Sequence, residues 1–208
     1  MAKLMKQISV ISFLLTVGFV ILYQNIQNTI VLSLAITFGT FENEEEEQSM
    51  ILLLEGIVMC FLLLIVCVIG IANGPVNLVV LYEDDVQERV VELGLITKEQ
   101  IKRNFIITCI ALFAPIFIVT PYMVYGINGA TGFWDGFWQM NIILWIAGLF
   151  DRFFIDWYWV GKTKAWIIPG TEDLQPYIPQ NVLIRKWLGT IVGYPIMSAM
   201  IAGIMLLF

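Results

Sequence analysis

Residues 50–71 read MILLLEGIVMCFLLLIVCVIGI, an apolar run broken by one charged residue, Glu55. A helix needs about 20 predominantly apolar residues to cross the hydrocarbon core of a bilayer, so this run predicts a transmembrane helix. Glu55 lies about a turn and a half from one end of the run. We expect it to be close enough to the outer surface to remain hydrated.

The rest of the chain repeats this pattern. Of 208 residues, 59% are hydrophobic and 13% are charged, and the long apolar runs place the chain among integral membrane proteins. We predict an all-α, polytopic membrane helix bundle that forms a single domain over residues 1–208. Its five spans are expected at about 8–38, 50–71, 104–125, 137–160 and 187–208. The first span is long, so it is either one tilted or bent helix or a helix broken at 24–28.

The basic residues predict the orientation. With five spans, all eleven Lys and Arg residues fall on one side of the membrane or at its edge, whereas the acidic run of residues 42–47 and the short loop 128–135 fall on the other. Loops rich in Lys and Arg stay in the cytoplasm. We therefore expect a cytoplasmic N-terminus, an external C-terminus and a location in the plasma (inner) membrane.

Two cytoplasmic loops, 72–103 and 161–186, are expected to be ordered. In the first, Asp85–Leu93 has helical spacing with Gly94 as a stop, and Thr97 with Gln100 fits a capping box at the start of a second helix. In the second, three prolines favour a compact surface loop. Trp166 and Tyr177 there suit the membrane interface, where aromatic side chains are enriched.

The segment 151–156, Asp-Arg-Phe-Phe-Ile-Asp, contains the strongest candidate site. Charges inside a span are costly and are often functional. On an α-helix Arg152 and Asp156 share a face and can pair, whereas Asp151 lies about 140° from Asp156. One interpretation is an anchor, with Arg152 reaching the headgroups and Asp156 neutralising it. The other is a cytoplasm-facing pocket in which Arg152 binds an anion and a carboxylate acts as base or proton carrier.

Other polar residues extend this hypothesis. Asn25 and Asn28 could line a hydrated cavity in the first span, and a proton path between Glu55 and Asp151 is conceivable. Asp84, Asp85 and Glu88 have a spacing that could hold Mg²⁺ against a diphosphate, although acids are also favoured at a solvated helix start.

The packing of the helices is also marked in the sequence. Gly189 and Gly193 form a Gly-x-x-x-Gly pattern, which allows close helix approach to a membrane partner or to a second copy. Pro115, Pro121 and Pro195 each remove a backbone donor and favour a kink. The three cysteines lie inside apolar runs and are expected to be free thiols.

The sequence excludes several classes of function. The absence of histidine argues against haem sites with His ligands, Ser-His hydrolases and His-zinc proteases. No phosphate-binding Gly-x-x-x-x-Gly-Lys loop is present, the net charge is −6, and we expect no nucleic-acid partner and name no cofactor. The leading hypothesis is a small transporter-like protein or a subunit of a membrane complex. The alternative is a membrane enzyme acting on a lipid or isoprenoid phosphate at the inner leaflet.

Overall fold

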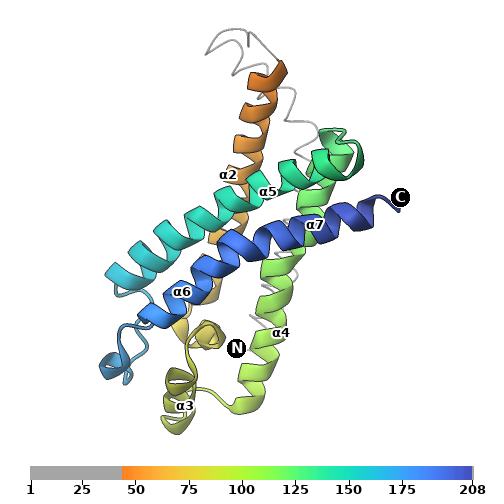
Figure 1. The fold of residues 1–208 in the computed structure, drawn as a ribbon. Coiled ribbons are helices and arrows are strands. Elements are labelled where there is room, and N and C mark those ends of the chain that lie inside the picture. The colour runs from red at the N-terminus through yellow and green to blue at the C-terminus, as the bar shows by residue number, and fades with distance from the viewer. Residues whose placement is uncertain (1–43, 208) are drawn as a thin grey trace.

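The computed structural model describes residues 44–207, and every regular element in this range is a helix (Figure 1). The predicted all-α class is therefore confirmed for this part of the chain. The predicted first span at 8–38, with Asn25 and Asn28, lies outside the described residues.

Three of the described helices are long and apolar enough to cross a membrane: Glu45–Ile71, Lys98–Ile127 and Gln180–Met205. The first is α2 (Glu44–Ile71). The second joins α4 (Lys98–Ala114) to two π-helical segments, η2 (Pro115–Val119) and η3 (Tyr122–Ile127). The third joins α6 (Gln180–Leu188), the π-helical η6 (Gly189–Gly193) and α7 (Tyr194–Met205). They match the predicted second, third and fifth spans, and each helix begins several residues before the apolar run from which its span was predicted.

A fourth long helix corresponds to the predicted span at 137–160. It consists of α5 (Gly132–Phe150), which continues into the π-helical segment η4 (Asp151–Val160). In Figure 1, α5 lies beside α7, and it also packs against α2. At Gly148 of α5 a β-carbon would come within 2.4 Å of the Tyr194 ring and 2.9 Å of Thr190, so this glycine permits the close approach to η6 and α7. Gly189 and Gly193 have no such neighbours within the described residues.

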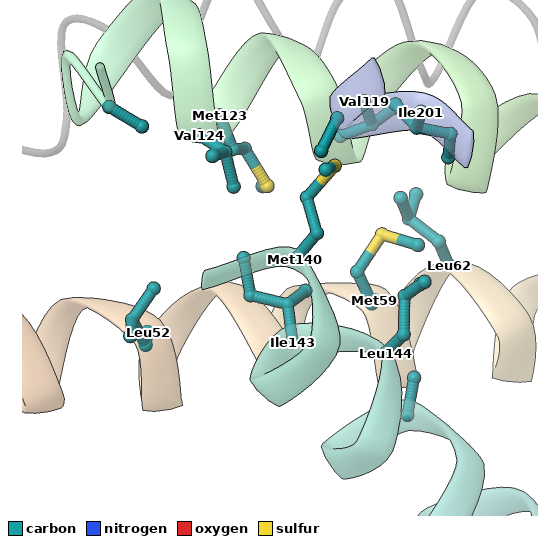
Figure 2. Close-up of a cluster of buried hydrophobic side chains, with 13 residues drawn as sticks. Leu52, Met59, Leu62, Val119, Met123, Val124, Met140, Ile143, Leu144 and Ile201 are labelled. Atoms are coloured by element: carbon teal, nitrogen blue, oxygen red, sulfur yellow. The ribbon is translucent and has the colours of Figure 1, made fainter. Parts of the chain in front are cut away.

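The main core lies between α2, α5, α7 and the two π-helical segments that extend α4. Figure 2 shows Met140 of α5 directed toward Val119 of η2 and Ile201 of α7, and all three are at most 4% exposed. Unbranched methionine side chains fill irregular gaps between helices well. This core joins α5 to both of its neighbours.

Every predicted proline kink coincides with a change of helical register. Segment η2 begins at Pro115, η3 follows Pro121, and η6 ends just before Pro195. A proline donates no backbone hydrogen bond, so the preceding turn loses a partner, and a π-helical turn is a common local adjustment to such an interruption.

The loop between α2 and α4 contains a 3-10 helix, η1 (Pro75–Leu81), and a short helix, α3 (Asp84–Glu92). The predicted stop is confirmed, since Gly94 has a φ of +68°. The predicted capping box is also confirmed: Gln100 N donates to Thr97 Oγ1 (3.3 Å), and Thr97 N donates to Gln100 Oε1 (2.9 Å). On the predicted apolar face Val86 and Val90 are buried, but Leu93 is half exposed.

The second loop, which contains the 3-10 turn η5 (Glu172–Leu174), packs against the first. The Tyr82 hydroxyl donates to the Trp166 carbonyl (2.6 Å), and its ring meets that of Tyr177 edge-on at 5.0 Å. Burial raises the pKa of Tyr82 above its usual range, which keeps the hydroxyl a donor. The prediction that Trp166 and Tyr177 face the membrane interface is wrong: they are 3% and 7% exposed, because the two loops fold onto each other.

Candidate functional site

Four charged side chains meet where η4 passes α6. Arg152 pairs with both Asp151 and Asp156, and the Lys186 ammonium lies 2.6 Å from Asp156 Oδ1. The side chains of Arg152 and Asp156 are 7% and 4% exposed, whereas those of Asp151 and Lys186 are 21% and 32% exposed. We call these four residues the charged cluster. Two carboxylates and two cations give it no net charge when all four are ionised.

The predicted pairing of Arg152 with Asp156 is confirmed. The predicted separation of Asp151 from Asp156 is wrong, because it assumed α-helical geometry. Residues 151–160 are π-helical, and in a π-helix the residue five positions on lies approximately one turn above. Asp151 and Asp156 therefore lie close to one face of the helix and line the same cavity.

Lys186 is the member of the cluster that the sequence analysis missed. It was assigned only to the cytoplasmic set of basic residues, 30 positions from Asp156 in the chain. A signal was nevertheless present in the sequence. Two acids and one arginine leave one negative charge without a partner, and burying an unpaired carboxylate is costly. A second cation from another helix was therefore to be expected.

Three cavities meet at the charged cluster. The first, of about 380 Å³, has Asp151, Arg152 and Lys186 at its wall. The second, of about 160 Å³, is lined by Asp151, Asp156 and Lys186, and the third, of about 340 Å³, lies against the second loop and shares Asp156. Asp151 and Lys186 therefore line both the first and the second cavity, and Asp156 lines both the second and the third.

Arg152 retains unused hydrogen-bonding capacity. Within residues 44–207 its buried Nε has no hydrogen-bond partner, and its Nη1 pairs with Asp156 Oδ2 without hydrogen-bond geometry. A buried donor without a partner destabilises the folded state unless a ligand or water satisfies it. Arg152 also lines the first cavity together with Lys186, so the two cations of the cluster stand at the wall where an anion would bind.

Glu55 belongs to a separate polar group. It is fully buried, so the expectation that it remains hydrated is wrong. The reason is that Asn128, which follows η3, donates to Glu55 Oε2 and also to Gln139 of α5, each at 3.0 Å. Gln139 in turn donates to the exposed Asp135 at 2.7 Å. Glu55 lines none of the three cavities at the charged cluster, so a proton path to Asp151 gains no support.

The acids predicted to bind magnesium lie at the start of α3. Asp84, Asp85 and Glu88 are all exposed, and Asp85 accepts a hydrogen bond from the Val86 amide at 2.8 Å. Within residues 44–207 no three His, Cys, Asp or Glu side chains are grouped closely enough to hold a metal ion. The arrangement matches a solvated helix start, where acids favour the helix dipole.

The fold and the site together describe an all-helical protein with membrane-length helices and a buried charged cluster between cavities. Models of known protein families, curated proteins and solved structures were compared with the chain, and none matches it.

The charged cluster predicts a large difference between two arginines of the chain. Removing one partner of a buried ion pair costs about 3–5 kcal/mol, whereas exposed pairs contribute about 0–1 kcal/mol. Arg152→Gln should therefore lower the free energy of unfolding by about 3–5 kcal/mol. The matched change Arg185→Gln removes an exposed pair with Glu83 (3.0 Å) and should change it by less than about 1 kcal/mol. Unfolding of both variants in the same detergent measures this, and equal effects would contradict it.

Proposed function

We propose that the chain is a multi-pass plasma-membrane protein with five spans, a cytoplasmic N-terminus and an external C-terminus. Three helices of membrane length support it, as does α5 with η4, which packs between two of them. The direction of α2 adds support, because the exposed acids Glu45, Glu46 and Glu47 stand at its start and the folded loops follow its end. In this orientation the charged cluster lies toward the cytoplasm.

Labelling of single cysteines tests this topology. In a variant with Cys60, Cys67 and Cys109 replaced by alanine, Glu46→Cys and Asp135→Cys should react with a membrane-impermeant maleimide on intact cells. Glu172→Cys should react only after the cells are opened. All three positions are exposed, so accessibility reports the side of the membrane. Labelling of Glu172→Cys on intact cells would contradict the orientation.

Within this topology, the proposed activity is transporter-like: the charged cluster binds a small anion on a route through the membrane part of the protein. The observation that carries this proposal is the meeting of three cavities at the cluster. An ion pair that only anchors a helix at the headgroups needs no cavity on either side. Arg152 and Lys186 would bind the anion, and Asp156 would hold these two cations in place.

Charge balance assigns a role to Asp151. The cluster is neutral when all its members are ionised, so a bound anion would leave one uncompensated negative charge in a largely buried site. Uptake of one proton by Asp151 restores neutrality. Asp151 is the more exposed of the two acids, and in the described residues it pairs with Arg152 alone, whereas Asp156 pairs with both cations. In the described residues Cys67 of α2 and Tyr194 of α7 also lie near Asp151, and a thiol and a phenol are ordinarily uncharged at pH 7.

Binding of radiolabelled methanesulfonate, which stays a monoanion between pH 6 and pH 8, tests this proposal. If one proton is taken up with each anion, the affinity should rise by up to about tenfold for each unit by which the pH falls. In Asp151→Asn the side chain is permanently neutral, so binding should become independent of pH. Lys186→Gln should weaken binding, whereas the matched change at the exposed Lys164, Lys164→Gln, should not.

Two results would overturn the proposal. Absence of methanesulfonate binding by the folded wild-type protein would remove the anion site. Binding with the same pH dependence in wild type and in Asp151→Asn would remove Asp151 from the mechanism.

A further inference from the structure

The first cavity is amphipathic. Its charged end is formed by Asp151, Arg152 and Lys186, and the remainder of its wall is mainly apolar. The apolar wall includes side chains from four helices: Met59 and Leu62 of α2, Ala111 of α4 with Ile116 of η2, Leu144 of α5 and Met197 of α7. A free inorganic anion would use only the charged end. The long apolar wall therefore indicates a ligand that carries a hydrocarbon part as well.

The cavity also has an open side. Gly189 and Gly193 line it, and a β-carbon built on either residue would meet no atom of the described residues within 4 Å. Across the cavity stands the α4 helix, whose Phe113 lines the same space and is 45% exposed. In the described residues α4 packs against η1 and α2, whereas α7 packs against α5, so α4 and η6 form separate walls. In the proposed topology this side lies within the membrane, and among residues 44–207 no element covers it.

We propose that the first cavity binds a single-chain amphiphile with an anionic head, which enters from the lipid. The head would lie against Arg152 and Lys186 at the charged end, and the chain would lie along the apolar wall. A volume of about 380 Å³ is near the lower end of the range of about 300–1,000 Å³ for small-molecule sites, which fits one chain better than a two-chain phospholipid. This inference rests on the proposed anion site and names its substrate class.

Competition between two ligands with the same head tests the proposal. The protein is placed in phosphatidylcholine nanodiscs, which carry no net lipid charge, and radiolabelled methanesulfonate is displaced by unlabelled methanesulfonate or decanesulfonate. Transfer of each methylene from water into an apolar site raises the affinity severalfold. Decanesulfonate should therefore compete at least about tenfold better than methanesulfonate, even after correction for its partition into empty nanodiscs. Decyl phosphate and decanoate are tested as competitors in the same assay. If decyl phosphate competes better, the natural ligand is a phosphate ester; if decanoate competes better, it is a fatty acid.

A matched pair of variants shows whether the chain occupies this cavity. Gly193→Leu adds a side chain at the open side of the cavity, where a β-carbon meets none of the described atoms within 4 Å. Gly203→Leu adds the same side chain at a position where a β-carbon is equally unobstructed in the described residues but which does not line the cavity. Gly193→Leu should remove the advantage of decanesulfonate while methanesulfonate still binds. Gly203→Leu should leave both unchanged.

The outcomes separate this inference from the function on which it rests. If methanesulfonate binds and decanesulfonate competes no better, the amphiphile is refuted and the anion site stands. If neither sulfonate binds, both fail. If Gly193→Leu changes the oligomeric state in cross-linking and leaves decanesulfonate binding intact, the glycine face serves contact with a second copy, and the amphiphile proposal is overturned.

Discussion

The mutual neutralisation of Asp151, Arg152, Asp156 and Lys186 is the constraint on which the rest of the site depends. Each charge would be costly alone between these helices, and together they form a neutral group that joins η4 to α6. Because the cluster is neutral, a charged ligand that binds to it introduces a net charge, which a second ion must compensate. An anion and a proton are the simplest pair of ligands that leaves the cluster neutral. The cavities beside the cluster give the anion access to it, in line with the proposed activity.

The helical scaffold explains why the cluster is accessible although it is buried. α5 packs against α2 and α7 through methionines and close contacts at Gly148, so the walls on that side are tight. On the other side, α4 and η6 leave the first cavity open at Gly189 and Gly193 in the part of the chain that the structure describes. The two loops fold together around Tyr82 and bound the second and third cavities. Tight packing on one side and open space on the other are what a binding site inside a helix bundle requires.

The sequence predicted the parts of this structure that depend on local pattern. Apolar runs predicted the long helices, the capping box at Thr97 was correct, and the spacing of Arg152 and Asp156 predicted their pair. It did not predict features that depend on contacts between distant segments. The burial of Glu55 requires Asn128, the burial of Trp166 requires Tyr82, and the fourth charge of the cluster comes from Lys186. The π-helical register of η4 also had no local signal, and it determines where Asp151 lies.

Infrared difference spectroscopy tests the central claim most directly, because it detects protonation of a carboxylate on ligand binding. Addition of methanesulfonate to the wild-type protein at pH 7 should produce the carbonyl band of a protonated carboxylic acid. In Asp151→Asn this band should be absent although the anion still binds. Saturation of the wild-type protein with methanesulfonate without any new protonated-carboxyl band would contradict the account.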